Sequence, residues 1–294
     1  MTEPTSSRRP RPVLRAVGAI VAFYLLGFLL SALLLLPFAP LLARGATPTE
    51  LAEHPTVVFA LGQGVVLLLC FGAATWLVGV RALRLGAADL RWRTPLPWVQ
   101  GLGVGLVLGF LPAAVAMTMG VFTAGAGWSH DGGSLGAWLS QVTKTVLILA
   151  PAALAEELMF RGLPMVVVAR VIGRGRAIVL LSVLFALAHL TNPNVTSAGI
   201  GNIALAGIFL SLAFFSAGGM WTAFGAHLGW NATLAALAAP VSGLPFDIPY
   251  IDYHMGGPAW LTGGAFGPEG GLLATGVLAA AAVLVARWNG KEPT

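Results

Sequence analysis

The sequence predicts an all-α fold, a polytopic transmembrane bundle of about eight helices with both termini in the cytoplasm. Of the 294 residues, 57% are hydrophobic and only 9% are charged, whereas soluble domains are about 25% charged. Apolar runs recur along the chain, and crossing the core of a bilayer takes about 20 such residues. Arginines gather at the ends of these runs, which is the bias of cytoplasmic loops.

Three spans are expected first, at about 16–40, 56–80 and 97–122. Residues 13–139 therefore hold the N-terminal helices, and the Arg- and Pro-rich residues 1–12 before them are expected to be disordered. The first apolar run is longer than a signal-peptide core and lacks a convincing cleavage site, so we expect it to remain as a span. The basic loop between Arg81 and Arg93 places that side of the bundle, together with the N-terminus, in the cytoplasm.

Five further spans are expected, at about 140–169, 177–192, 199–217, 219–239 and 270–287. The first four form a helical core over residues 140–240, and residues 241–294 hold an outer loop, the last helix and a short tail. The loop at about 240–268 is rich in Pro, Gly and aromatic residues. It could cap a site, but we interpret it as an interfacial loop with a Trp/Tyr belt.

Composition also excludes several classes of protein. A formal net charge of +5 would suit nucleic-acid binding if the basic side chains formed one patch, but they are distributed over the ends of the spans. The single cysteine, Cys70, excludes an intrachain disulfide and a cysteine-based metal site. We therefore expect an integral membrane protein that contacts the lipid bilayer and binds no nucleic acid. Its composition indicates a bacterial plasma membrane.

Gly101, Gly105 and Gly109 recur at intervals of four residues in the third expected span. They share one helix face, and small residues let transmembrane helices approach closely. A phosphate-binding glycine loop is not expected, because no strand precedes them. The repeat therefore predicts a closely packed neighbouring helix.

The apolar core is interrupted by three charges in AEELMFRG, residues 155–162. Ionisable side chains in the middle of a membrane cost at least a few kcal/mol each unless they are paired or line a wet cavity. Glu157 and Arg161 are spaced i, i+4, about 40° apart on a helix, with the acid in the favourable N-terminal position. Glu156 points about 100° away from Glu157. We therefore assign Glu157 and Arg161 to a structural ion pair and Glu156 to chemistry.

Two other expected helices carry polar side chains at a similar depth. Phe185 and His189 share a face in FALAH, and His227 and Asn231 share a face in HLGWN. Counted from the basic residues at the cytoplasmic ends of the helices, the heights of these polar residues and of Glu156 overlap within about one to two turns. We expect His189, His227 and Asn231 to converge on Glu156, with Phe185 in a packing role.

Such a cluster suits amide hydrolysis. A carboxylate beside an imidazole can activate water as a general base, and a histidine with an asparagine can donate hydrogen bonds to the tetrahedral oxyanion. Because no Ser or Cys accompanies the set, water is expected to attack directly. Zinc held by Glu156, His189 and His227 is the chemical alternative. Zinc would bind the Glu156 carboxylate, which could then no longer act as the general base. Because no HExxH motif is present either, no cofactor is favoured.

Three motifs occur in order: EExxxR at Glu156–Arg161, FxxxH at Phe185–His189 and HxxxN at His227–Asn231. Together they resemble the CPBP family of intramembrane proteases, which includes the CAAX prenyl endopeptidases and the bacterial Abi-type, bacteriocin-immunity-associated proteins. The motifs cover about residues 140–240, while the remaining spans are supported only by their number.

The resemblance implies that Glu156 activates water with His189 as its partner. It further implies that His227 and Asn231 stabilise the oxyanion and that the Glu157–Arg161 pair supports the site. Members of the family have been described both as metalloproteases and as glutamate-dependent, so the resemblance leaves the metal open.

The implied activity is that of an intramembrane endopeptidase acting on a membrane protein or a lipidated peptide. The alternative is a non-catalytic membrane adaptor or bacteriocin-immunity-type protein that keeps the polar site without using it. A proton-coupled transporter is a third hypothesis, but the sequence shows no internal repeat that would favour it.

Overall fold

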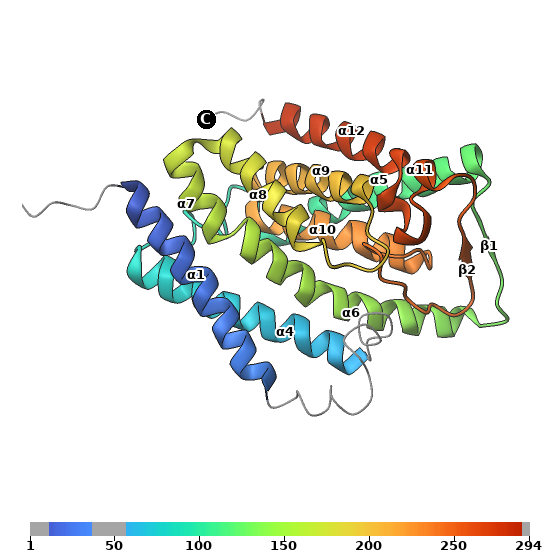
Figure 1. The fold of residues 1–294 in the computed structure, drawn as a ribbon, viewed down its shortest axis with the longest axis horizontal. Helices are drawn as coiled ribbons and strands as arrows, with labels where there is room; N and C mark the ends of the chain where they lie inside the picture. Colours follow the sequence, from blue (N-terminus) through green and yellow to red (C-terminus); the bar gives the residue numbers. More distant parts are fainter. Residues whose placement is uncertain (1–11, 37–56, 290–294) are drawn as a thin grey trace, which may run out of the picture.

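The computed structural model describes residues 12–36 and 57–289 (Figure 1). The regular secondary structure of the described residues is helical apart from a short antiparallel ribbon of β1 (Gly127–Ser129) and β2 (Asp252–His254) and one isolated bridge. The predicted all-α class is thereby confirmed. The disorder expected for residues 1–12 concerns positions outside the described residues, except that the first helix already includes Pro12.

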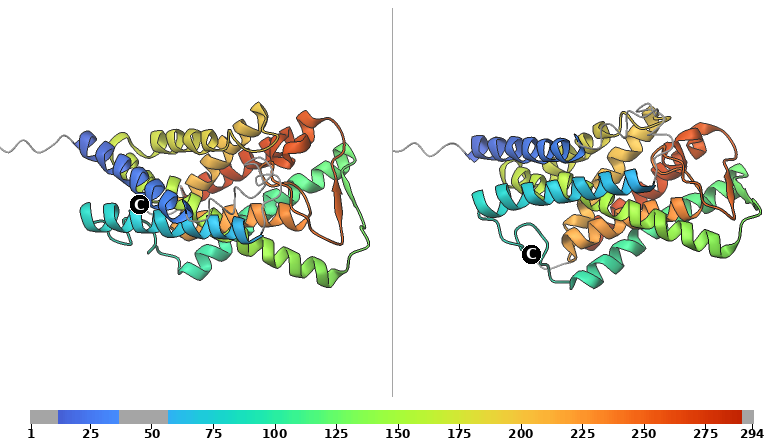
Figure 2. Two further views of the ribbon diagram at one scale, coloured as in Figure 1. Left: turned by 60° about the horizontal axis from the view of Figure 1, so that its bottom comes forward. Right: turned by 90° about the horizontal axis from the view of Figure 1, so that it is seen from below.

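The helices of the N-terminal part are α1 (Pro12–Leu35), α4 (Val57–Ala74), its π-helical continuation η2 (Thr75–Ala82) and α5 (Trp98–Ala124). The core holds α6 (Leu135–Phe160), α7 (Leu163–Ile172), α8 (Arg174–Ala188), α9 (Ser197–Phe214) and α10 (Gly219–Ala236). The last part holds α11 (Ala259–Thr262), η3 (Gly264–Phe266), η4 (Pro268–Gly270) and α12 (Leu272–Asn289). In space, α6 packs against α4 and α10, and α1 lies beside α4 (Figures 1 and 2).

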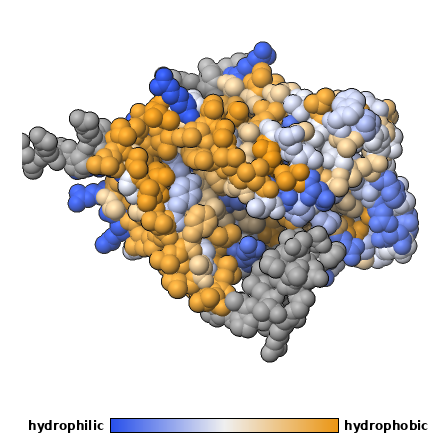
Figure 3. Space-filling model, viewed as in Figure 1, coloured by the Kyte–Doolittle hydropathy of each residue, from blue (hydrophilic) through white to orange (hydrophobic). Residues whose placement is uncertain are grey.

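Within the described residues, four helices are long and apolar enough to cross a membrane: Val13–Leu35, Gly62–Ala82, Trp98–Ala124 and Ser197–Phe214. Each coincides with one of the eight expected spans. Hydrophobic residues dominate much of the face in Figure 3, whereas hydrophilic residues gather at the end of the molecule that carries β1 and β2. A lipid environment explains why so many large apolar side chains are exposed. The chain is therefore an integral membrane protein.

The single span expected over 140–169 is divided in two, because α6 ends at Phe160 and α7 begins at Leu163. Pro164, at the start of α7, has no N–H to continue the hydrogen bonds of α6, and inside a continuous helix its ring would clash with the carbonyl four residues earlier. Gly162 makes the close turn, since a Cβ there would lie 2.6 Å from the carbonyl oxygen of Leu158. The break places both glutamates close to the C-terminal end of α6.

The glycine repeat of α5 packs against α10, as predicted. A Cβ at Gly105 would lie 2.4 Å from the carbonyl oxygen of Thr222, and one at Gly109 would lie 2.0 Å from that of Ala226. Only glycine allows the two backbones to approach this closely. The repeat therefore fixes the position of α10, which carries two of the expected site residues.

Residues 240–271, called here the pocket segment, pack partly inside the molecule. Phe266 is fully buried, Ile248 is 3% exposed and Glu269 is 8% exposed. Asn202 of α9 holds the end of the segment, because its side-chain amide donates to the carbonyl oxygens of Glu269 at 2.7 Å and Gly271 at 2.9 Å. The interpretation as an interfacial loop is thus incomplete, since much of the segment is covered by protein.

Candidate active site

The break between α6 and α7 positions the charged residues of the core. Glu156 and Glu157 lie at the C-terminal end of α6, where the helix dipole disfavours negative charge. Arg161 is the C-cap residue, so its guanidinium supplies the positive charge that this helix end requires. From α1, the Tyr24 hydroxyl donates to the carbonyl oxygen of Met159 at 2.7 Å and anchors the same helix end.

The expected ion pair between Glu157 and Arg161 is present and fully enclosed. Nη1 of Arg161 lies 3.0 Å from Oε1 of Glu157, and the side chains are 1% and 0% exposed. The guanidinium also donates through Nη2 to the carbonyl oxygen of Gly207 at 3.2 Å, and its Cζ lies 4.3 Å from the centroid of the Phe185 ring. Separating such a pair would leave an uncompensated buried charge.

A second partner of Glu157 was not predicted from the sequence. Nδ1 of His227 donates to Oε1 of Glu157 at 2.8 Å, so one carboxylate oxygen holds both Arg161 and His227. Oε2 of Glu157 is buried and has no hydrogen-bond partner among the described residues. Glu157 therefore does more than neutralise Arg161, because it also fixes the orientation of the His227 ring.

Glu156 faces away from Glu157, as the helical geometry predicted. Its Oε2 lies 3.8 Å from Nε2 of His189 and 3.8 Å from Nε2 of His227. The side chain of Glu156 is 34% exposed, in contrast to the fully buried Glu157. Two adjacent glutamates thus occupy different environments, one open and one enclosed.

His189 lies just beyond the end of α8, as its C-cap residue. Its Nδ1 donates to the carbonyl oxygen of Phe185 at 2.8 Å, and the Phe185 ring packs against it with 4.6 Å between centroids. The same Phe185 ring also contacts His227 edge-on, at 6.0 Å. Phe185 therefore packs against both imidazoles and lies beneath the guanidinium of Arg161.

The hydrogen bonds of the two imidazoles determine what faces Glu156. Because Nδ1 carries the hydrogen in both His189 and His227, Nε2 of each neutral ring is an acceptor. Two imidazole lone pairs and a carboxylate then face one another at 3.8 Å, too far for direct hydrogen bonds. A molecule that donates hydrogens, such as water, fits between these acceptors.

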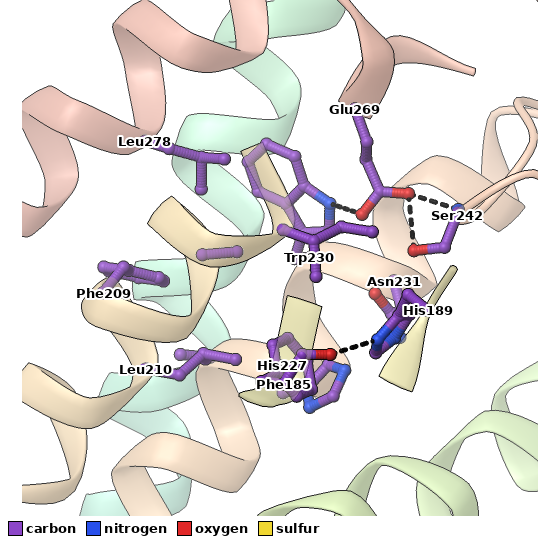
Figure 4. A pocket seen from close by; sticks show the side chains of 13 residues that line it. Phe185, His189, Phe209, Leu210, His227, Trp230, Asn231, Ser242, Glu269 and Leu278 are labelled. Carbon is purple, nitrogen blue, oxygen red and sulfur yellow. Dashed lines mark hydrogen bonds between the residues drawn. The ribbon is translucent and has the colours of Figure 1, made fainter. Parts of the chain in front are cut away.

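A pocket open to solvent adjoins this cluster, with an empty volume of about 410 Å³ that includes its opening. His189, His227 and Asn231 lie on its wall, together with apolar side chains such as Phe209 and Leu210 (Figure 4). The structure thus places Glu156 beside His189 and His227. Asn231 lines the pocket together with the same two histidines.

The polar end of the pocket contains residues that sequence reasoning missed. Glu269, placed in an outer loop from the sequence, lines the pocket with Ser242 and Trp230 (Figure 4). Its Oε1 accepts a hydrogen bond from Nε1 of Trp230 at 3.0 Å, and its Oε2 accepts one from the Ser242 hydroxyl at 3.0 Å and another from the Ser242 amide. Burial raises the pKa of the Glu269 carboxyl above its ordinary value of 4.5, although these hydrogen bonds oppose the shift. The available sequence signal was an acidic residue directly before an apolar run.

The same residues can be tested as a metal site. One carboxylate and two imidazole nitrogens are donors that zinc accepts, and hydrogen-bonded Nδ1 atoms are common in zinc sites. However, across residues 12–36 and 57–289 no group of three or more His, Cys, Asp or Glu side chains is arranged to hold a metal ion. Zinc at Glu156, His189 and His227 therefore stays the chemical alternative to a site without a cofactor.

The fold and the site define a helical membrane protein with a carboxylate–imidazole cluster beside a pocket. Residues 138–233 match the family described as type II CAAX prenyl endopeptidase Rce1-like, and this range includes all three motifs. This match, over about a third of the chain, supports the assignment of residues 138–233 to a CAAX-type protease domain. Neither a curated protein nor a solved structure matches the chain.

Proposed function

We propose that the protein is an intramembrane endopeptidase that hydrolyses peptide bonds of membrane-associated substrates with water activated by Glu156. The observation that carries this proposal is the position of the Glu156 carboxylate, 3.8 Å from Nε2 of both His189 and His227. A water molecule between these atoms has a carboxylate to accept its proton and an imidazole to orient it.

The chemistry proceeds in two steps. Glu156 accepts a proton from the water while the oxygen forms a bond to the carbonyl carbon of the substrate, and His189 orients the water. The tetrahedral oxyanion accepts hydrogen bonds from the amide of Asn231 and from Nε2 of His227 in its protonated form, which Glu157 stabilises through Nδ1. The carbon–nitrogen bond then breaks, and the proton held by Glu156 passes to the leaving amine.

The substrate is a membrane protein or a lipidated peptide. Glu156 is partly exposed although it belongs to an apolar helix bundle, so a substrate chain can reach it without unfolding of the core. The site is set in helices that pack within lipid, and no nucleic acid is expected to bind. We favour catalysis without a cofactor, and dialysis against a chelator is expected to leave the rate unchanged. Loss of activity that Zn²⁺ restores would favour zinc at Glu156, His189 and His227 instead.

The topology proposed with this function has eight spans, with both termini in the cytoplasm of a bacterial cell and the helices in its plasma membrane. Arg81, Arg93, Arg170 and Arg174 then lie on the cytoplasmic side, and Asp131 and Asp252 lie on the outer side. The positive-inside bias is the support for this orientation.

Comparative membrane proteomics tests the proposed function. Cells that carry wild-type protein are compared with cells that carry Glu156→Gln, and at least one membrane protein is expected to accumulate uncleaved in the variant. If no membrane protein differs, although both proteins are present in equal amounts, the protease is contradicted.

The second candidate is an adaptor or immunity-type protein that binds a partner without cleaving it. The fully buried ion pair of Glu157 and Arg161 favours this second candidate, because these two charged residues have a structural role. Complementation separates the two functions. An adaptor predicts that Glu156→Gln restores the cellular phenotype fully while Glu157→Ala does not, whereas the protease predicts that both fail.

A further inference from the structure

The pocket contains a third carboxylate, Glu269, that the proposed mechanism does not use. Its side chain is 8% exposed, and both oxygens accept hydrogen bonds, one from Trp230 and two from Ser242. Hydrogen bonds to an ionised acceptor are roughly twice as strong as neutral ones. The buried Glu269 carboxylate therefore connects α10, which supplies Trp230, to the part of the pocket segment that contains Ser242.

On one side, the connection leads to His189. The carbonyl oxygen of Ser242 accepts a hydrogen bond from the side-chain amide of Asn192 at 2.8 Å. The main-chain N–H of Asn192 in turn donates to the carbonyl oxygen of His189 at 3.1 Å. Because α8 ends at Ala188, His189 is not enclosed in a helix, and such contacts hold the turn that contains it.

On the other side, the connection leads to α10. Trp230 directly precedes Asn231 and lies three residues after His227, in the same helix. Its indole nitrogen reaches Glu269 from within the pocket wall (Figure 4). One carboxylate thus joins the turn of His189 to the helix that carries the other two pocket-lining site residues.

We propose that Glu269 is a positioning residue, whose carboxylate sets the distance between His189 and α10. It acts on His189 through Ser242 and Asn192. It acts on α10, which carries His227 and Asn231, through Trp230. This inference rests on the proposed function for its catalytic meaning. The position of His189 relative to α10 can be probed without a substrate. Both Glu269 and Ser242 lie outside the range 138–233 of the matched family domain.

The test measures how fast diethyl pyrocarbonate modifies each histidine of the full-length purified protein, by mass spectrometry. The first variant is Glu269→Gln, which places an amide N–H₂ against at least one hydrogen-bond donor. The second is Asn192→Ala, which removes the hydrogen bond from Asn192 to the carbonyl oxygen of Ser242. Asp252→Asn is the matched control, because Asp252 is an exposed acid of the same segment. His130 and His254, both exposed, serve as internal references.

We expect both variants to raise the modification rate of His189 at least roughly threefold while His130 and His254 react as in wild type. The double variant is expected to add little to the larger single effect, because both changes interrupt one connection. An unchanged rate at His189 in both single variants overturns the proposal, and so do effects that multiply in the double variant. If Glu269→Gln does not fold, Asn192→Ala alone decides the outcome.

The activity of the same proteins separates this inference from the proposed function. If Glu156→Gln still cleaves the substrate found by proteomics, the proposed function fails whatever the labelling shows. If Glu156→Gln is inactive and Glu269→Gln cleaves with the wild-type kcat and KM, the positioning role fails while the protease stands. We expect a kcat at least roughly tenfold lower for Glu269→Gln in protein that melts cooperatively.

Discussion

At the scale of single residues, the site depends on the different environments of two adjacent glutamates. Glu157 is enclosed with Arg161 and His227, while Glu156 faces the imidazole nitrogens and remains 34% exposed. The angular separation along a helix was sufficient to predict this difference. It follows that the two glutamates respond differently to the same substitution.

The buried pair gives the first prediction. Glu157→Ala leaves the guanidinium of Arg161 buried and unpaired, and this is expected to destabilise the protein by about 3–5 kcal/mol. Replacing both residues, as in Glu157→Leu with Arg161→Leu, removes the uncompensated charge and is expected to recover much of that stability. Thermal unfolding in one detergent measures both. Equal destabilisation by the single and the double change would contradict the importance of the pair.

Not every residue of the site was predictable. The hydrogen bond between His227 and Glu157 joins positions 70 apart and depends on the rotation of α10, which no local pattern reveals. Glu269 was placed in an outer loop, because an acid in a Gly- and Pro-rich stretch is solvated by default. Its burial arises from the long-range packing of the pocket segment against α9 and α10.

At the scale of helices and strands, the order and positions of the helices followed from hydropathy. The division between α6 and α7 did not, because the apolar run continues through Leu163–Val168 and hides the break. Pro164 was the available signal, since a proline inside a helical pattern usually ends or kinks the helix. This break matters for the site because it places Arg161 at a helix end.

The contact between α5 and α10 gives the second prediction. Gly109→Val is expected to separate these helices, because its first side-chain atom would lie 2.0 Å from the carbonyl oxygen of Ala226. Since α10 carries His227 and Asn231, we expect lower thermal stability together with lost cleavage. The matched control is Gly103→Ala, in the same helix, where nothing lies within 4 Å of an added Cβ. Similar behaviour of both variants would contradict close packing as the role of the repeat.

At the scale of the whole molecule, the charge distribution sets the proposed orientation in the membrane. Hydrophilic residues gather at the end that carries β1 and β2 (Figure 3). The sequence predicts the orientation only through its arginines.

Cysteine accessibility gives the third prediction. With Cys70 replaced by Ser, single cysteines are introduced at Arg93 and at Asp131, in loops at the two ends of α5. A membrane-impermeant maleimide added to intact cells is expected to label the cysteine at 131 and to label the one at 93 only after the cells are permeabilised. The reverse pattern would invert the topology, and labelling of both in intact cells would place the two loops on one side.

The most direct test of the central claim compares wild type with Glu156→Gln in cleavage of the substrate that accumulates in the variant's membranes. Both proteins are purified in the same lipid, and their melting temperatures are measured first. Because loss of a general base typically costs about 10²–10⁴-fold in rate, we expect a kcat lower by that factor with an unchanged melting temperature. A correctly folded Glu156→Gln protein that cleaves at the wild-type rate would contradict the account.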